Sequence, residues 1–464
     1  MSDASQQRLV FDLDLIKKYD QSGPRYTSYP TAVKFSEAFG EAEYREVARE
    51  SNSSDNPLSL YFHIPFCDTI CFYCACNKIA TKDRSKAAEY LQRVKKELGM
   101  QGELFDNSRP VEQLHWGGGT PTFLSGSEMR GLMQATAEAF QLVDDDRGEY
   151  SIEIDPREAD ADTVKLLREI GFNRMSLGVQ DYDPKVQQAV NRLQSREITE
   201  NVLNAARAEG FRSVSVDLIY GLPQQTVEGF RTTLDAILEA QPDRLSIFNY
   251  AHLPELFKPQ RRIHVEELPE ASEKLDILQM TAEKLEQAGY LFIGMDHFAR
   301  PDDELAVAQR EGTLYRNFQG YSTHSHCDLI GIGVTSIGMV GDSYSQNLRT
   351  LDDYYAAIDS GHLPVHRGLA LNRDDLIRRD VITRLICHFR LDFSSLSTRW
   401  EIDFKDYFAQ QLERLQQMQA DGLLVISDHG ISVEPKGRFL IRNICMVFDA
   451  YLNPQGEQRF SKVI

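Results

Sequence analysis

The sequence of 464 residues lacks long apolar segments. It contains no run of about 18 apolar residues, the length that a transmembrane helix needs. Residues 1–20 carry Asp3, Asp12 and Asp14 and have no apolar stretch of the kind found in signal peptides. We therefore expect a cytoplasmic protein that makes no membrane contact.

Positive charge is also in short supply. The chain has 51 Lys and Arg against 70 Asp and Glu, which gives a formal net charge of −19 at pH 7. Such a charge repels a phosphate backbone as a whole, so we expect no nucleic-acid partner. The length allows more than one domain, and we expect a monomer.

Cysteine is scarce as well, but it is concentrated. Four of the seven cysteines, Cys67, Cys71, Cys74 and Cys76, fall within ten residues. A disulfide staple and a metal or iron-sulfur site both place thiols this close together. A reducing compartment does not keep structural disulfides, so the cytoplasmic expectation favours the metal or iron-sulfur site.

Short β-rich segments alternate with amphipathic helical ones between residues 57 and 300. The predicted strands are 58–64, 111–118, 149–155, 173–180, 212–221, 243–251 and 290–296. Glycine at 171, 210 and 289 marks the ends of the intervening helices. A strand recurs about every 30 to 40 residues, which predicts the α/β class and a partial TIM-like (β/α) barrel of parallel strands, with an open doubly wound sheet as the alternative.

Polar and small residues follow the predicted strands where each one ends. They are Gly117 to Thr120 after the second strand, Glu153 and Asp155 at the third, Gln180 at the fourth, Asp217 at the fifth and Tyr250-Ala251 at the sixth. In parallel α/β folds the carboxyl ends of the strands carry the functional residues. We therefore expect these residues to meet the cysteine segment, which follows the first strand.

Two further regions flank the barrel, which we assign to residues 56–366 together with accessory strands. Residues 1–55 form an N-terminal arm, and its segment 23–35 is a strap that acts either as a lid or as a packed extension. Residues 367–464 form a mostly helical, winged-helix-like C-terminal domain with helices at 373–388, 404–421 and 437–452 and strands at 423–427 and 431–435. It lacks a clear basic stripe, so we favour a structural or substrate-covering role over DNA binding.

The cysteine spacing itself distinguishes two kinds of site. Cys67-x3-Cys71-x2-Cys74 supplies three thiolates from one loop, which would leave one iron of a four-iron cluster open to a small molecule. A structural zinc site would need Cys76 as its fourth ligand. Structural zinc sites normally take cysteine pairs from two separate segments, and all four cysteines here come from one, so we favour iron-sulfur.

A wider set of motifs resembles a known family. CxxxCxxC with Tyr73 before its third cysteine, followed by GGGT after the second strand, is similar to the radical S-adenosylmethionine (SAM) superfamily. Within that superfamily, the chain resembles the oxygen-independent coproporphyrinogen III oxidases over essentially its whole length. The matching segments are GPRYTSYPTA, YFHIPFC, CACNK, HWGGGTPT, EIDPRE, GVQD, VNR, DLIYGLP, FNYAHLP, GMDHFARPDDELAVAQREG and NFQGY.

The resemblance implies a radical SAM enzyme of haem biosynthesis. Such an enzyme converts the ring A and B propionates of coproporphyrinogen III to vinyl groups, releases carbon dioxide and yields protoporphyrinogen IX without oxygen. A propionate C–H bond is too strong for a side-chain base, so the cofactors must supply the radical while the protein binds and orients. The implied cofactors are one [4Fe-4S] cluster and two SAM molecules, and the implied partners are an electron donor and an unknown electron acceptor.

The same resemblance assigns residues to roles. Cys67, Cys71 and Cys74 would bind the cluster, and His63, Cys76 and Gln319 would assist the reaction. Around the cluster-bound SAM we expect Tyr61, Gly118, Glu153, Ala251 and Ile337. Around the second SAM we expect Tyr73, Gly119, Thr120, Gln180, Arg192 and Asp217.

Some features stand outside this pattern. Ala75 occupies a position where we expect glycine, and we interpret His324-Ser325-His326-Cys327 as an exposed loop, although HxHC by itself suggests metal binding. Cys387 and Cys445 lie on apolar helical faces and are expected in the core. Candidate cations for the substrate carboxylates are Arg25, Lys258, Arg261 and Arg262. The main alternative function is a related haem-binding chaperone, against which Cys76, EIDPRE and GPRYTSYPTA argue.

Overall fold

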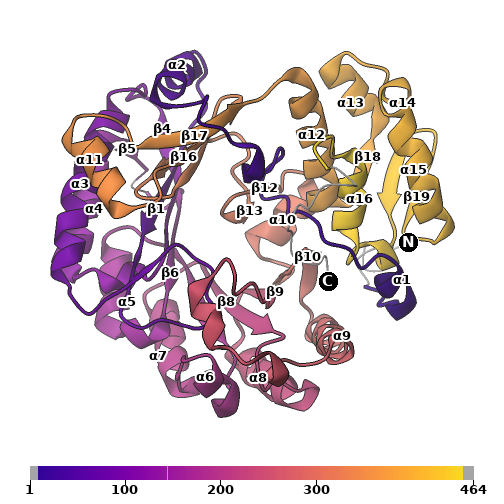
Figure 1. Cartoon of the computed structure of the whole chain (residues 1–464), viewed down its shortest axis with the longest axis horizontal. Helices are drawn as coiled ribbons and strands as arrows, with labels where there is room; N and C mark the ends of the chain where they lie inside the picture. The colour runs from indigo at the N-terminus through magenta and orange to yellow at the C-terminus, as the bar shows by residue number, and fades with distance from the viewer. Residues whose placement is uncertain (1–8, 144, 453–464) are drawn as a thin grey trace.

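The computed structural model describes residues 9–143 and 145–452. Parallel strands form the wall of a partial barrel, with helices on its outer side (Figure 1). Along the sheet the order is β9-β8-β7-β6-β4-β1-β14, and each neighbouring pair is parallel. Their bounds are β1 (Leu58–Ile64), β4 (Pro110–Gly118), β6 (Glu149–Ile154), β7 (Arg174–Gln180), β8 (Ser213–Tyr220), β9 (Arg244–Asn249) and β14 (Asp328–Ile332).

The predicted barrel is confirmed, and the helices between its strands begin and end as the sequence indicates. Side chains of Ser125, Asp160, Ser195 and Thr226 cap the helix N-termini, and Gly171, Gly210 and Gly289 take the positive φ values expected after a helix end. The helices are α3 (Ser85–Gly102), α4 (Gly126–Ala139), α5 (Ala161–Glu169), α6 (Pro184–Ala189), α7 (Arg196–Ala208), α8 (Val227–Ala240) and α9 (Ala271–Gln287).

One predicted strand has a different role. Residues 290–296 contain β10 (Leu291–Gly294), which pairs antiparallel with β11 (His297–Ala299), and β11 pairs antiparallel with β9. The prediction of a further parallel unit here is wrong, because the two residues between β10 and β11 allow a hairpin but no crossover. The additional parallel strand is β14, at the other side of β1, and β15 (Ile337–Val340), β16 (Ser343–Asn347) and β17 (Val365–Ala370) extend the sheet beyond it in antiparallel order.

Shorter elements complete this part of the chain. They are β2 (Phe66–Cys67), β3 (Ile79–Ala80), β5 (Gln141–Leu142), α10 (Glu304–Glu311), β12 (Tyr315–Asn317), β13 (Gly320–Ser322) and α11 (Leu351–Asp359). In the part of the chain that the structure describes, none of the helices combines the length and apolarity needed to cross a membrane.

The C-terminal part is mostly helical. It comprises α12 (Arg373–His388), β18 (Arg390–Asp392), α13 (Phe393–Trp400), α14 (Phe404–Tyr407), α15 (Ala409–Ala420), β19 (Leu424–Ile426), β20 (Gly430–Val433) and α16 (Ile441–Phe448). The strands form a small antiparallel sheet in the order β18-β20-β19. Cys387 and Cys445 are fully buried, so their predicted place in the core is confirmed. Residues 453–464 of the predicted domain lie outside the described residues.

The N-terminal arm contains α1 (Leu13–Lys18) and α2 (Glu41–Ser51), with the strap of residues 23–35 between them. Figure 1 shows this indigo segment passing from the C-terminal helices toward the barrel. Arg442 of α16 donates to the backbone oxygen of Pro24, and Tyr26 donates to Asp449 at 2.9 Å. Because Tyr344 of β16 also donates to the oxygen of Tyr29, the strap ties the C-terminal helices to the extended sheet.

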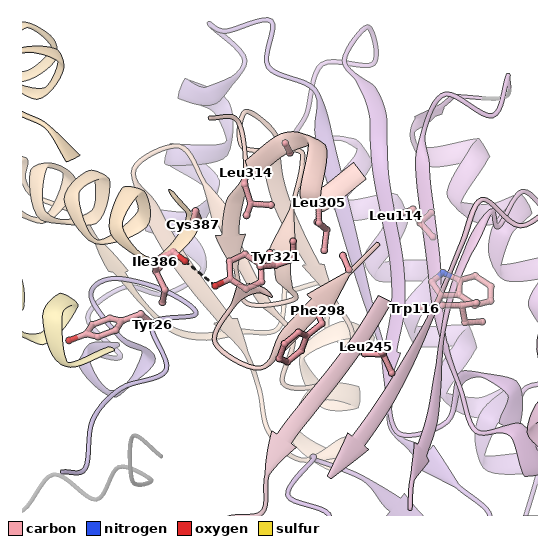
Figure 2. Close-up of a cluster of buried hydrophobic side chains, with 14 of the residues drawn as sticks. Tyr26, Leu114, Trp116, Leu245, Phe298, Leu305, Leu314, Tyr321, Ile386 and Cys387 are labelled. Carbon is pink, nitrogen blue, oxygen red and sulfur yellow. Dashed lines mark hydrogen bonds between the residues drawn. The ribbon is translucent and has the colours of Figure 1, made fainter. Parts of the chain in front are cut away.

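One continuous apolar core runs through both parts (Figure 2). Trp116 of β4 is fully buried and meets Phe172 edge to face, with ring centroids 4.9 Å apart. Farther along, the Tyr321 hydroxyl of β13 donates to the backbone oxygen of Ile386 in α12 at 3.0 Å. The C-terminal helices therefore share a core with the barrel, which fixes them beside its open side.

Candidate active site

The cysteine segment lies at the mouth of the barrel, by which we mean the carboxyl ends of the parallel strands. β1 continues through Pro65 into β2, and β2 pairs with β3, so residues 68–78 form a loop closed at its neck. Two backbone hydrogen bonds hold this neck: the Ile79 amide donates to the oxygen of Pro65 at 2.7 Å, and the Thr81 amide donates to the oxygen of Cys67 at 2.9 Å. None of the seven cysteines forms a disulfide in the described structure.

Two guanidinium groups face the sulfur of Cys71. Arg192 Nη1 lies 3.5 Å and Arg157 Nη2 3.7 Å from this sulfur, and both arginines also donate to Asp155. Burial raises the pKa of Asp155, but the two guanidiniums outweigh it and leave that pKa below its usual value. The positive charge beside Cys71 suits a bound group that carries net negative charge.

Cys74 and Cys76 interact with each other. The hydrogen bond with Cys76, together with Lys78, lowers the pKa of the Cys74 thiol to about 5, whereas the same bond raises the pKa of Cys76. A thiolate is the form in which cysteine binds metal. This division supports Cys74 as a ligand and Cys76 as a cysteine that keeps its proton.

The spacing of the sulfur atoms separates a cluster from a single ion. Among the described residues, no three sulfurs of the cysteine segment lie within 4.8 Å of one another. A zinc ion with sulfur at about 2.3 Å would need a tighter group, whereas an iron-sulfur cluster distributes its ligands over several metal atoms. In the described structure the cysteine segment therefore forms no preformed site for a single zinc ion.

The glycine loop after β4 is joined directly to this segment. Gly118 has φ of +111°, and a Cβ there would lie 2.6 Å from the His63 ring. A Cβ on Gly119 would lie 2.7 Å from the backbone oxygen of Phe66, and the Gly119 and Thr120 amides donate to Ile64 and Phe66 at 2.8 Å. Close approach of the chain to itself already requires these glycines, whether or not a ligand also contacts them.

Polar side chains line the inside of the barrel next to the cysteines. Tyr61 stacks on His115, with centroids 5.9 Å apart, and Glu153 accepts from the Gly118 amide at 3.0 Å. Burial raises the pKa of Glu153, but the His115 and Gly118 hydrogen bonds outweigh it and leave that pKa below its usual value. Its side chain is nevertheless 47% exposed, so the barrel interior is open here. Asp217 accepts from Ser176 at 2.9 Å, and burial raises its pKa to about 6.

Both ring nitrogens of His63 are engaged. Nε2 lies 2.9 Å from the Asn77 backbone oxygen, which can only accept, so Nε2 carries the proton. Nδ1 then accepts from the Tyr61 hydroxyl at 3.1 Å. Burial lowers the pKa of His63, in agreement with a neutral ring that connects β1 to the cysteine segment.

Unpartnered polar atoms and backbone strain gather at the end of β7. Gln180 has φ of +70°, and the pairing with β8 shifts register between Gly178 and Gln180. Within the described chain, Gln180 Oε1 and Arg192 Nε are buried without a hydrogen-bond partner. Native proteins rarely leave such atoms unpaired, so a polar ligand that reaches them would fit.

The remaining predicted residues are spread around the mouth. Tyr73 packs against an apolar cluster that includes Tyr250, and Ile337 shares a cluster with Tyr61. Ala251 lines a cavity of about 490 Å³ together with Arg25 of the strap. Gln319 lies between β12 and β13, and its Nε2 is buried without a partner among the described residues.

Three of the four predicted cations make other contacts in the described structure. Arg25 pairs with Asp296 at 2.8 Å, Arg261 donates to the oxygen of Pro254, and Arg262 lies over the ring of Phe72, while Lys258 begins a short 3-10 helix. Sequence reasoning missed Arg316, which is 7% exposed, and Arg379. Both line one small cavity, and in the described structure each has buried N–H groups without a partner. Lys258, Arg261 and Arg262 are close together in the sequence and therefore form a visible pattern. Arg316 and Arg379 lie 63 positions apart and form none.

The HxHC segment lies at the opposite end of the barrel. His326 is exposed, but Cys327 is 5% exposed, so the interpretation of an exposed loop is wrong for Cys327. The backbone of the next residue explains this burial, because the Asp328 amide donates to the oxygen of Pro57 and starts β14 inside the sheet.

Known proteins resemble the chain over its whole length. Residues 61–237 match the Radical SAM superfamily, and residues 371–440 match the HemN C-terminal domain. The oxygen-independent coproporphyrinogen III oxidase of Pseudomonas aeruginosa is 55% identical over 98% of this chain and 99% of its own length, and that of Escherichia coli K12 is 53% identical over 99% and 100%. The solved structure of coproporphyrinogen III oxidase from Escherichia coli, a radical SAM enzyme, superposes with a TM-score of 0.92 at 52% identity and covers 96% of this chain and all of its own.

Proposed function

Because the chain belongs to the oxygen-independent coproporphyrinogen III oxidases of the radical SAM superfamily, we propose that the barrel mouth is its active site. The chain is an oxygen-independent coproporphyrinogen III oxidase. It converts two propionates of coproporphyrinogen III to vinyl groups by oxidative decarboxylation in haem biosynthesis. The observation that carries the proposed location is the cysteine segment, which opens onto the barrel interior beside Glu153, Tyr61 and Arg192.

Cys67, Cys71 and Cys74 hold the [4Fe-4S] cluster in this proposal. Thr120 Oγ1 lies 3.5 Å from the Cys67 sulfur, and Arg157 and Arg192 bring positive charge to Cys71. When bound, the cluster and SAM supply the radical that removes a hydrogen atom from a propionate side chain. The protein binds and orients the reactants and keeps water away.

Two groups of residues would hold SAM. The group nearest the cluster is Tyr61, Gly118, Glu153, Ala251 and Ile337, in which the Glu153 carboxylate suits a ribose hydroxyl or a positive charge. The second group contains the unpartnered Gln180 Oε1 and Arg192 Nε, which support a further polar ligand. Its members are Tyr73, Gly119, Thr120, Gln180, Arg192 and Asp217.

His63, Cys76 and Gln319 keep the roles that the sequence predicts, with one refinement. His63 bonds to Asn77 and Tyr61 through both nitrogens, so it acts by holding the cysteine segment in place. Cys76 lies outside the CxxxCxxC set and carries the one further thiol of the cysteine segment, so it is the candidate proton donor there. Gln319 offers an unpartnered amide to the substrate.

Arg316 and Arg379 are the cations that we assign to the substrate carboxylates. Their buried N–H groups lack partners in the described structure, and the hairpin β12–β13 places Arg316 close to Gln319. A buried guanidinium with free donors is suited to bidentate carboxylate binding. An Arg316→Gln variant should raise the KM for coproporphyrinogen III about tenfold or more while deoxyadenosine formation from SAM alone persists.

The cellular setting follows from the same chemistry. An iron-sulfur cluster held by cysteine thiolates, together with four further cysteines that form no disulfide, suits a reducing compartment, so we place the enzyme in the cytoplasm. The electron donor, the electron acceptor and the monomeric state remain predictions. For the domain division we propose a boundary near residue 371, because β17 continues the sheet to Ala370.

Anaerobic incubation with SAM, a one-electron reductant and coproporphyrinogen III tests the function. We expect deoxyadenosine, carbon dioxide and the divinyl product, and a purified protein with about four irons. Deoxyadenosine without vinyl product, together with tight haem binding, would instead establish the chaperone alternative. A colourless zinc protein would rule out both.

A further inference from the structure

Three potential metal ligands meet at the base of the barrel, by which we mean the amino ends of the parallel strands. One ligand atom each from Glu112, His326 and Cys327 lies within 4.8 Å of the other two. The imidazole Nε2 of His326 is 3.1 Å from Oε2 of Glu112. Glu112 comes from the start of β4, and the other two residues come from the loop between β13 and β14, more than 200 positions later.

A β-bulge brings Glu112 to this position. Leu58 of β1 pairs with Val111 and Ser59 pairs with Gln113, so Glu112 is the extra residue that has no partner on β1. Bulges change the direction in which a side chain points. In a regular strand, the alternation of side chains along β4 would decide to which face of the sheet Glu112 points. The bulge interrupts this alternation at the residue that joins the ligand cluster.

The other two ligands are held by their neighbours. Cys327 is fixed because Asp328 donates its amide to Pro57 at 3.0 Å, while the Asp328 carboxylate forms a buried ion pair with Arg109. The His326 ring stacks on that of His324, with centroids 6.2 Å apart. The site is therefore largely formed before any ion enters.

From this arrangement we propose that Glu112, His326 and Cys327 bind one zinc ion. Carboxylate oxygen, imidazole nitrogen and thiolate sulfur together match the ligand set of zinc, and a water molecule completes the four positions. Cys327 releases its thiol proton to solvent when the ion binds. The ion joins the start of β4 to the loop before β14, at the end of the barrel away from the cysteine segment, and its fourth position stays open to water.

An ordinary surface ion pair between His326 and Glu112 is the competing explanation. His362 and Glu41 form such a pair at 3.0 Å elsewhere on the surface. What distinguishes the base is the buried thiol of Cys327. His362→Ala is therefore a matched control, since it removes a histidine–glutamate pair that has no cysteine beside it.

Elemental analysis of the anaerobically purified full-length enzyme tests the proposal. After equilibration with zinc sulfate and removal of loosely bound metal, we expect about one zinc per chain in addition to the iron of the cluster. Cys327→Ser and Glu112→Gln should each weaken zinc binding about tenfold or more and leave the iron content unchanged. His362→Ala should retain both metals.

Thiolates are zinc ligands in general, so a variant without the cluster cysteines is needed to separate the two sites. The full chain with Cys67, Cys71 and Cys74 changed to Ala should keep one zinc, which the additional Cys327→Ser change removes. Zinc should also raise the Tm of the wild type but not that of Glu112→Gln, which preserves the shape of the side chain. Zinc content that follows the three cluster cysteines, or that is equal in wild type and Cys327→Ser, would overturn the proposal.

Discussion

The two ends of the barrel strands are both polar but differ in how their polar groups are satisfied. At the base, Gln113 accepts from Ser59 at 2.9 Å and donates to Glu149 at 2.8 Å and Ser322 at 3.1 Å. At the mouth, Gln180 and Arg192 keep buried atoms without partners in the described structure, and Gln180 has positive φ. The same strands thus end in a satisfied network on one side and in an incomplete one on the other.

This difference separates stability from binding. A completed buried network such as the one around Gln113 stabilises the fold, whereas unpaired groups and strain cost stability and persist where a ligand completes them. Substitutions at the base should therefore affect mainly the free energy of unfolding. Substitutions at the mouth should affect mainly cofactor binding and turnover.

The largest effect is expected at the cysteine segment. Cys71→Ala removes one of three cluster ligands, so we expect loss of the cluster and of all deoxyadenosine formation, measured by iron content and anaerobic turnover. Cys387→Ser, in the core of the C-terminal part, is the comparison, because it should lower Tm but retain about four irons. If Cys387→Ser lost its iron as well, iron retention would not depend on the cysteine segment in particular, and the proposed difference between this segment and the core cysteines would be wrong.

The next effect concerns the base. Arg109 and Asp328 form an ion pair with side chains only 3% and 8% exposed. Arg109→Met leaves a buried carboxylate without its cation, which should cost about 3–5 kcal/mol of unfolding free energy. Denaturant unfolding measures this loss, and SAM affinity at a temperature where the variant is folded should match the wild type.

The exposed pair Arg130–Glu169 supplies the control for that experiment. Its side chains are 55% and 45% exposed, so Arg130→Met should change stability by less than about 1 kcal/mol. If Arg109→Met instead weakened SAM binding, the base and the mouth would be coupled. The assignment of stability to the base and of binding to the mouth would then be wrong.

Much of this contrast was visible in the sequence. Strand positions agreed with the structure within two residues, because alternating apolar segments bounded by glycine and polar residues are local signals. The placement of Cys67, Gly118, Glu153 and Gln180 at one edge followed from the rule that parallel strands end together, whereas Asp217 lies inside β8, three residues before the end of that strand.

The features that the sequence did not predict depend on strand register and on contacts between residues far apart in the chain. The sequence did not reveal that β10 turns back through Met295 or that β14 joins β1 at its other side. Likewise, Arg157 and Arg192 reach Cys71 only in the folded chain, and Glu112 meets Cys327 next to a β-bulge that the sequence does not show. Such contacts join residues tens to hundreds of positions apart and leave no local pattern.

A third experiment tests a buried group near the mouth whose hydrogen bonds are complete. Glu97 of α3 is fully buried and accepts from the Gly333 amide and from Asn347, both at 2.8 Å. Burial raises its pKa to about 7, from an ordinary value of 4.5. The folded chain therefore holds this proton at pH values where the unfolded chain has lost it, so stability falls as pH rises from about 4.5 to 7.

The contribution of Glu97 is up to about 3 kcal/mol, and Glu97→Gln should make the fall of stability between about pH 4.5 and 7 shallower because the amide does not titrate. Unfolding free energies at several pH values measure it. Glu89→Gln on the exposed face of the same helix should keep the wild-type slope. A Glu97→Gln variant with an unchanged slope would assign the pH dependence to another group.

The smallest effect is expected for Arg192→Lys, and it tests the incomplete network directly. The Arg192 guanidinium reaches Cys71, Asp155 and the Gly178 oxygen at once, and an ammonium group cannot span these three partners. We expect SAM affinity to fall about ten- to a hundredfold, equivalent to about 1.4–2.8 kcal/mol, with little change in iron content. Arg196→Lys, whose partners are surface glutamates, should bind SAM like the wild type. Because lysine keeps the charge, a loss confined to Arg192→Lys would assign the binding to the geometry of the donors, whereas unchanged affinity would mean that the unpaired atoms at the mouth serve no ligand.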